Sequence, residues 1–298
     1  MESAIIQTIT PVTHDLGAFK VRRALPTRER TMVGPFIFVD EFGPARLPPG
    51  QGMDVRPHPH INLATVTYLI EGAIEHRDSL GNRQVIEPGA VNLMTAGKGI
   101  VHSERSPADS RAAGPSFYGM QTWLALPDGK EEVDPSFDHV PGDGLPLVEA
   151  GGASARVLMG TLWGATAATP CISPTIYADM VLTVGSSIPI DADADERAVM
   201  LVGGEAELDG QRLEPFALYV LAPGHAARLT SSSEARAMLM GGGAFATPRH
   251  VYWNFVSSSR DRINQAKEDW QAMRFPLISG DDQEFIPLPE VPTTVSYP

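Results

Sequence analysis

Residues 57–60 read Pro-His-Pro-His, and residues 102–104, roughly forty positions later, read His-Ser-Glu. Each stretch places two potential metal ligands at positions i and i+2. Because alternate side chains of a β-strand share one face, each pair is expected to point the same way. Two such strands side by side would offer three imidazoles and one carboxylate, a set that suits a divalent transition metal and leaves coordination positions open. The spacing therefore predicts a metal site in a β-barrel, formed by His58, His60, His102 and Glu104. In a plainer interpretation, His58 and His60 are turn residues beside two prolines, and His102 is a structural histidine.

The sequence around these pairs consists of short apolar runs broken by Gly, Pro, Asn and Asp. Residues 64–70, 90–94 and 198–202 are runs of strand length. Residues 78–82 and 208–211 are typical of hairpin tips. Many short strands with regular turns predict an all-β sandwich or barrel.

A loose internal repeat indicates two copies of one β-domain. A Gly-Glu turn and a Glu-Pro turn precede the His102 pair, and the same two turns recur before His225. The second copy has no His-x-His pair, so it is predicted to be metal-free. The proline-rich stretch 133–146 is the expected connection. The resulting domains are an N-terminal metal-binding domain at 1–135 and a C-terminal metal-free domain at 136–298.

One helix is expected near the C-terminus. Ser257–Ser259 can supply an N-cap, and residues 260–273 carry apolar side chains at helical spacing. Trp270 is expected to pack this helix onto the C-terminal barrel. An extended tail follows, at 282–289.

Composition restricts the partners and the compartment. The net charge of −13 argues against nucleic-acid or anionic membrane surfaces as main partners. The single cysteine, Cys171, cannot form an internal disulfide, which fits a reducing cytoplasm. The N-terminus shows no signal-peptide pattern, and no apolar stretch approaches the ~20 residues needed to span a bilayer. Gly97 and Gly99 do not form a phosphate-binding loop, because no helix is expected to follow them. The sequence therefore predicts no organic cofactor.

Several stretches together resemble the pirin family of the cupin superfamily. The most specific is Met-Thr-Ala-Gly-Lys-Gly-Ile-Val-His-Ser-Glu at 94–104. Matching stretches also occur at 22–26, 38–42, 57–60, 65–69, 253–259 and 275–289. The resemblance implies two cupin (double-stranded β-helix or jelly-roll) barrels with a short C-terminal helix.

The resemblance also implies one metal in the N-terminal barrel, held by His58, His60, His102 and Glu104. Iron is the metal most associated with the family, and Mn, Co, Ni, Cu or Zn would suit the same donors. Bacterial members resemble quercetinases, which open a flavonol with dioxygen, and members are often monomers. In this interpretation Glu104 either stays a ligand or takes the substrate proton as a general base.

Two departures from the family pattern concern the substrate. Residues 61–64 read Ile-Asn-Leu-Ala where pirins often have Arg-Gly-Phe-Glu, and many cupins carry a glutamate at the place of Ala64. These positions are expected at the pocket mouth. The segment 76–79, His-Arg-Asp-Ser, is expected at a hairpin tip, where capping of the turn is favoured over a place at the pocket rim.

The sequence is compatible with three functions. The first is a metal-dependent dioxygenase of quercetinase type, with a small flavonol-like substrate. The second is a non-enzymatic iron-binding redox sensor that acts through a protein partner. The third is a bicupin whose metal only stabilises a barrel. Open coordination positions weigh against the third, and the resemblance of residues 58–64 to bacterial members favours the first.

Overall fold

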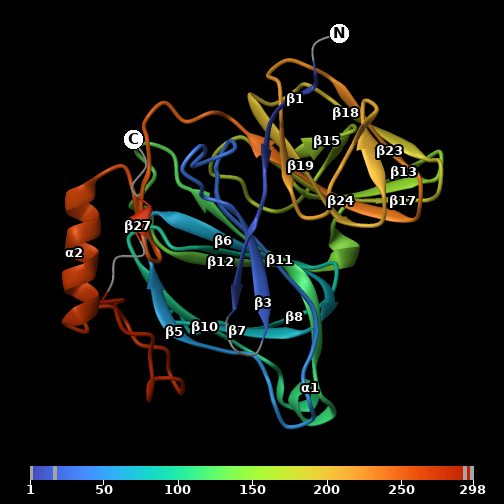
Figure 1. Cartoon of the computed structure of the whole chain (residues 1–298). Helices are drawn as coiled ribbons and strands as arrows, with labels where there is room; N and C mark the ends of the chain where they lie inside the picture. Colours follow the sequence, from blue (N-terminus) through green and yellow to red (C-terminus); the bar gives the residue numbers. More distant parts are fainter. Residues whose placement is uncertain (1–2, 16–18, 291–293, 296–298) are drawn as a thin grey trace. The chain divides into compact units, whose positions relative to one another are not determined.

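The computed structural model describes residues 3–15, 19–290 and 294–295, and it is built mostly of β-strands (Figure 1). Its contacts divide the chain into two compact units. The unit we call the N-barrel comprises His14–Val21, Phe38–Gly142 and Ala246–Pro298. The unit we call the C-barrel comprises Met1–Thr13, Arg22–Ile37 and Asp143–Phe245. The chain passes from the N-barrel to the C-barrel after Gly142, whereas the predicted boundary is residue 135. Met1–Thr13 and Arg22–Ile37 belong to the C-barrel, although the prediction placed them in the N-terminal domain. Ala246–Pro298 belongs to the N-barrel, although the prediction placed it in the C-terminal domain.

Two sheets form the N-barrel, with a small hairpin added by the C-terminal segment. The larger sheet has the strand order β12-β9-β6-β11-β4-β3-β2. Its strands are β2 (Val12–Asp15), β3 (Lys20–Leu25), β4 (Phe36–Arg46), β6 (Leu63–Gly72), β9 (Val91–Thr95), β11 (Ser116–Ala125) and β12 (Ser136–Val140). The smaller sheet has the order β5-β10-β7-β8, with β5 (Asp54–His60), β7 (Ile74–Asp78), β8 (Arg83–Ile86) and β10 (Ile100–Arg105). A third sheet joins β25 (His250–Tyr252), β26 (Phe255–Ser257) and β27 (Thr294–Val295), and a short helix α1 spans Ala108–Ala113.

The C-barrel repeats this arrangement. Its larger sheet has the order β1-β22-β19-β24-β17-β14-β13, and its smaller sheet has the order β18-β23-β20-β21. The larger sheet contains β1 (Ile5–Ile9), β13 (Leu147–Ala150), β14 (Ala153–Met159), β17 (Thr175–Leu182), β19 (Glu196–Gly203), β22 (Leu218–Leu221) and β24 (Ala235–Gly242). The smaller contains β18 (Ser187–Ile190), β20 (Ala206–Leu208), β21 (Gln211–Arg212) and β23 (Ala227–Ser231); a hairpin pairs β15 (Thr161–Leu162) with β16 (Ala165–Thr166). The matching strand orders confirm the predicted repeat and the all-β bicupin fold.

The expected connection at 133–146 is partly regular structure. Strand β12 pairs with β9 at the edge of the larger N-barrel sheet, and a 3-10 turn follows at Gly142–Gly144. The prolines of this stretch flank the strand, so they do not interrupt its hydrogen bonds. The stretch therefore completes the N-barrel sheet before the chain crosses to the C-barrel.

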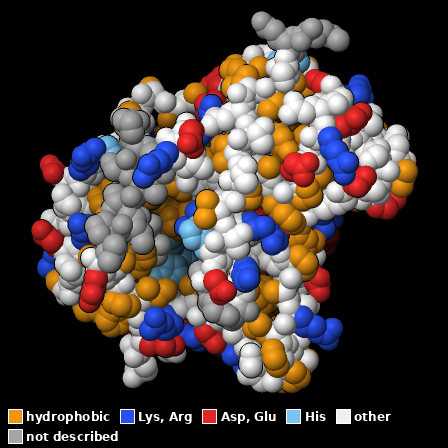
Figure 2. Space-filling view, in the orientation of Figure 1, with side chains coloured by type: hydrophobic (Ala, Val, Ile, Leu, Met, Phe, Trp, Pro, Cys, Tyr) orange, Lys and Arg blue, Asp and Glu red, His pale blue; other side chains and the backbone are white. Residues whose placement is uncertain are grey.

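Charged side chains of both signs are scattered over the face shown in Figure 2. On the face shown in Figure 2, the Lys and Arg side chains of the described residues are interspersed among Asp and Glu rather than gathered into one basic surface. Among the residues that the structure describes, no helix is both long and apolar enough to cross a bilayer.

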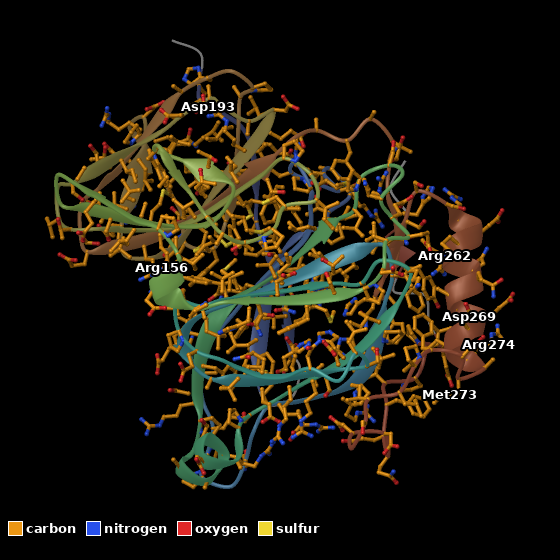
Figure 3. The ribbon with its side chains drawn as sticks, turned by 180° about the vertical axis from the view of Figure 1, so that it is seen from behind. Arg156, Asp193, Arg262, Asp269, Met273 and Arg274 are labelled. Carbon is orange, nitrogen blue, oxygen red and sulfur yellow. The ribbon has the colours of Figure 1, made fainter. Side chains whose placement is uncertain are left out.

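Helix α2 (Arg260–Gln271) begins where the sequence predicts. The side chain of Ser259 accepts a hydrogen bond from the backbone N–H of Arg262, which caps the helix. At the other end, Asp269 accepts a hydrogen bond from Arg274 at 2.7 Å (Figure 3). The buried face carries Ile263, Ala266 and Trp270.

The expectation that α2 packs onto the C-terminal barrel is wrong. Its buried face belongs to a core cluster with Ile61 and Val101, which lie beside β5 and on β10 of the N-barrel. The reason is that the segment from residue 246 onward returns to the N-barrel, where Phe255 forms a bridge with Ile61. The helix thus packs beside the two strands that carry the predicted ligands (Figure 1).

The tail after α2 is bound to the same two strands. The carboxylate of Asp281 accepts hydrogen bonds from Ser103 Oγ at 2.7 Å and from Arg105 at 2.6 and 2.9 Å. The backbone N–H of Ile286 donates to the carbonyl of Pro57 at 2.9 Å. Ser103 and Arg105 alternate with His102 and Glu104 along β10, so the tail stabilises the outer face of that strand.

Trp270 is expected to be a major source of this packing. It is 2 % exposed, contacts Phe275 and Phe285 edge to face, and donates its indole N–H to the carbonyl of Ile286 at 3.0 Å. Trp270→Ala should lower the free energy of unfolding by about 3–5 kcal/mol, measured by urea denaturation followed by circular dichroism.

Met273→Ala is the matched control for that substitution, because Met273 follows the same helix and is 45 % exposed (Figure 3). It should change stability by less than about 0.5 kcal/mol. Equal losses from the two substitutions would contradict this account of the packing.

Candidate metal centre

Strands β5 and β10 carry the two predicted ligand pairs and lie side by side as antiparallel neighbours. His102 is paired in register with His58, and Ile100 is paired with His60. Because side chains alternate along a strand, His58 and His60 share a face. The register therefore brings the His-x-His pair and His102 together.

The three imidazoles converge on one point inside the N-barrel. Nε2 of His60 lies 3.1 Å from Nε2 of His102, and the ring centroids of His58 and His102 are 4.4 Å apart. One ligand atom from each of the three residues lies within 4.8 Å of the other two. The rings are buried, with exposed fractions of 1 to 6 %. Three buried nitrogens grouped in this way can hold a metal ion.

Hydrogen bonds at Nδ1 orient all three rings. Nδ1 of His58 lies 2.8 Å from the carbonyl oxygen of Arg56, and Nδ1 of His60 lies 3.2 Å from that of Asn254. A carbonyl can only accept, so both Nδ1 atoms carry the hydrogen and both Nε2 atoms present a lone pair. Nδ1 of His102 faces a fourth histidine, His76, at 3.4 Å. The donor set therefore fits a cation.

Burial keeps these imidazoles neutral. It lowers the pKa of His58 from 6.5 to about 4, and it lowers the pKa values of His60 and His102 well below 6.5. Neighbouring imidazoles lower the values of His60 and His102 further, because a second positive charge nearby is unfavourable. A neutral imidazole is the form that binds metal, so the nitrogens stay available in mildly acidic solution.

The metal-free protein should lose stability as the pH falls from about 6.5 toward 4. In that window the unfolded chain takes up protons on histidines that stay neutral in the folded state. From the pKa of His58 alone, the loss is roughly 3 kcal/mol. Burial raises the pKa of Glu104, so this residue makes the folded state more stable as the pH falls. This single group opposes the three histidines.

Urea titrations of the metal-stripped protein between pH 8 and pH 5 measure this dependence. His58→Leu should have a shallower slope than the wild type, since one of the proton-binding differences is gone. A wild-type free energy of unfolding that stays constant over this range would contradict the assignment of buried neutral histidines.

Glu104 lies close to the histidines but is not one of the three grouped residues. A register shift between His102 and Glu104 interrupts their pairing with β5, and Glu104 is paired with His76 on β7. Its carboxylate is buried, and Oε1 lies within 3.5 Å of the Thr67 hydroxyl and 3.4 Å of the Gln121 amide. Burial raises the pKa of Glu104, and the neighbouring His76 and the contacts with Thr67 and Gln121 lower it by less. Its role as the fourth ligand remains a prediction.

The structure adds two residues to the site that the sequence interpretation placed in a turn. Asp78 does cap the hairpin, because its Oδ1 accepts from the backbone N–H groups of Leu80 and Asn82. His76 is 3 % exposed, contacts His102 through Nδ1, and lies 3.0 Å from Asp78 through Nε2. A signal was present in the sequence: His76 and Asp78 have the same i, i+2 spacing as the two ligand pairs.

The positions expected at a pocket mouth are instead buried structural residues. Ile61 is fully buried in the cluster beneath α2. Asn62 has a φ of 56° and donates its amide to the loop at Glu131 and Glu132. An aromatic ring, Trp123, lies beside the histidines at 5.1 Å from His60, with Phe38 stacked on it at 4.0 Å.

Comparison with known proteins gives the family. The pirin family model matches residues 18–124, and the model of the pirin C-terminal cupin domain matches residues 177–276. A pirin-like protein of Caulobacter vibrioides is 48 % identical over 279 residues, which are 93 % of this chain and 96 % of that protein. The chain belongs to the pirin family.

Two further relatives carry a dioxygenase name. A Pseudomonas aeruginosa protein, named only as a candidate quercetin 2,3-dioxygenase, is 36 % identical over 97 % of this pirin and 91 % of its own length. The crystal structure of a quercetin 2,3-dioxygenase from Acinetobacter baumannii superposes with a TM-score of 0.90 at 35 % identity, covering 97 % of this chain and 96 % of that one. The predicted family is confirmed, and these relatives suggest an oxidoreductase.

The two barrels of this pirin differ sharply at corresponding positions. In the C-barrel, Leu229 on β23 is paired with Ile188 on β18, just as His102 is paired with His58. Ile190 takes the place of His60, and Ser231 takes the place of Glu104. Aliphatic side chains thus occupy, in the C-barrel, the positions that correspond to the three histidines of the N-barrel.

Proposed function

We propose that this pirin is a metal-dependent dioxygenase of quercetinase type that opens the central ring of a flavonol-like substrate with dioxygen. The observation that carries the proposal is the convergence of three buried, neutral imidazoles beside a buried carboxylate. The relatives with dioxygenase names support the reaction class.

His58, His60 and His102 would hold the metal through Nε2, with Glu104 as the fourth ligand. Three nitrogens and one carboxylate suit Fe(II), and the same donors accept Mn, Co, Ni, Cu or Zn. When bound, a redox-active divalent metal makes a substrate hydroxyl more acidic and provides one-electron chemistry toward dioxygen. The orientation of all three rings by carbonyl or histidine partners makes the donor set ready before metal binds.

Glu104 is the residue proposed to take the proton of the flavonol 3-hydroxyl. The raised pKa of Glu104 gives the carboxylate a higher proton affinity than an exposed glutamate has. Thr67 and Gln121 both contact Oε1, so Oε2 would accept the proton when the carboxylate loosens from the metal. The Gln121 amide that donates to Oε1 is itself oriented, because its carbonyl oxygen accepts a hydrogen bond from Thr67 at 2.7 Å.

The stacked pair of Trp123 and Phe38 would provide an apolar wall for a planar substrate. The two rings are 12° from parallel, and the indole lies edge to face with His60. A flat aromatic molecule packs favourably against such a surface. Close burial of the histidines also keeps water away from the reacting groups.

Oxygen-isotope labelling tests the reaction type directly. Iron-loaded protein given quercetin under ¹⁸O₂ should yield a ring-opened product that carries two labelled atoms, as mass spectrometry would show. One labelled atom, or none, would mean that the protein is a monooxygenase or an oxidase and would overturn the proposal.

A further inference from the structure

A buried chain of three side chains leads away from His102. Nδ1 of His102 lies 3.4 Å from Nδ1 of His76, and Nε2 of His76 lies 3.0 Å from Oδ2 of Asp78. The three residues are between 1 and 3 % exposed. They come from neighbouring strands, since β10 pairs with β7 and places His102 opposite Asp78.

Only one arrangement of hydrogens on two neutral rings lets His102 offer Nε2 to a cation. The hydrogen of His102 must then be on Nδ1, which donates it to Nδ1 of His76. The hydrogen of His76 is then on Nε2, which donates to Asp78. The reverse arrangement would place an N–H of His102 toward the site and a lone pair of His76 against the carboxylate, where two acceptors would face each other.

Both partners of His102 are held firmly. Asp78 accepts hydrogen bonds from the backbone N–H groups of Leu80 and Asn82 at 2.9 and 3.0 Å, and from the Asn82 side chain. The ring of His76 is stacked on Phe137 at 4.5 Å and 17°. The geometry that selects the hydrogen positions is therefore built into the hairpin and the adjoining sheet.

The C-barrel provides an internal comparison. Strand β20 pairs with β23 in the same way that β7 pairs with β10, placing Ala206 opposite Ser231 and Leu208 opposite Leu229. Ala206 thus corresponds to His76, and Leu208 to Asp78. The C-barrel hairpin has a shorter tip, with Leu208 paired directly to Gln211, and it forms without either polar residue. The pair occurs in the barrel that has the three histidines.

We propose that His76 and Asp78 are positioning residues that fix the tautomer of His102 and strengthen it as a metal ligand. The carboxylate stabilises the N–H of His76, and His76 in turn draws the Nδ1 hydrogen of His102. Partners of this kind orient a metal-binding imidazole and raise its basicity, and their loss costs about 10–100-fold in metal affinity. This inference rests on the metal site of the proposed function, but it does not depend on flavonol turnover.

The test is the affinity for Co(II), titrated through the visible absorption of the bound ion, in wild type, His76→Leu and His139→Leu. His139 is a matched control because it lies on β12 of the same barrel and bonds Asn92. His76→Leu should weaken Co(II) binding by about 10–100-fold, and His139→Leu should leave it unchanged. Unchanged binding in His76→Leu, or an equal loss in both variants, would overturn the proposal.

Asp78→Asn keeps the test decisive if His76→Leu does not fold. Asparagine is nearly the same size as aspartate and keeps a side-chain oxygen that can accept the hydrogen bonds of the turn. The unfolding temperature should therefore change little, while the affinity for Co(II) falls. If folded Asp78→Asn bound Co(II) with wild-type affinity, the proposed role of Asp78 and His76 in fixing the His102 tautomer would be overturned. Failure of the metal site itself looks different, because then His102→Ala would bind Co(II) as well as the wild type.

Discussion

Replacing His102 with alanine is expected to leave a folded protein that can hardly retain a divalent metal. His102 contributes one of three grouped imidazoles, and its Nε2 lies 3.1 Å from that of His60. Protein sites with four ligands bind zinc with about 10–16 kcal/mol, so one ligand is worth on the order of 3 kcal/mol. The dissociation constant for Fe(II) or Co(II) should therefore rise about 100-fold or more. Metal content after anaerobic loading and desalting measures the effect.

His225→Ala is the control for this substitution. His225 belongs to the C-barrel, where its side chain is 38 % exposed and lies 3.8 Å from Asp209. The variant should bind metal like the wild type. Full metal content in His102→Ala would exclude the three-histidine site as the place of binding.

Glu104→Gln should separate catalysis from stability. Loss of a general base typically costs 10²–10⁴-fold in rate, so kcat for flavonol consumption should fall by about that factor. The metal-free variant should unfold at the same temperature as the wild type or at a higher one. The physical reason is that burial disfavours the charged carboxylate, as the raised pKa of Glu104 indicates, and a neutral amide removes that cost.

Glu75→Gln provides the comparison on the neighbouring strand. Glu75 is also buried, but its carboxylate pairs with Arg77 and Arg83 rather than with the site. This variant should keep its activity and lose some stability instead, because burial opposes ionisation of Glu75 while hydrogen bonds from these arginines lower its pKa. Equal kcat in Glu104→Gln and wild type would remove Glu104 from the chemistry.

The three histidines could be predicted from the sequence because the spacing of two residues along a strand determines whether their side chains lie on the same face. His58 and His60 at i and i+2 must share a face on any regular strand, and the same reasoning applies to His102 and Glu104. The structure groups the histidines as expected. The register shift after His102 was not predictable, since a bulge depends on how β5 and β10 pair.

Other features depend on contacts between distant parts of the chain. The sequence shows that residues 260–273 can form an amphipathic helix, but an apolar stripe does not identify the surface that covers it. The bridge between Phe255 and Ile61 decides that α2 packs on the N-barrel. In the same way, His76 and Asp78 read as turn residues until β7 is placed beside β10.

Oxygen uptake by Fe(II)-loaded protein given quercetin, with His102→Ala measured in parallel, would show whether this metal centre is a dioxygenase. We expect uptake that equals the loss of quercetin mole for mole and that disappears in the variant. No uptake with iron demonstrably bound to the wild type would contradict turnover of quercetin at this site. It would leave a metal centre that serves another substrate or a redox-sensing role.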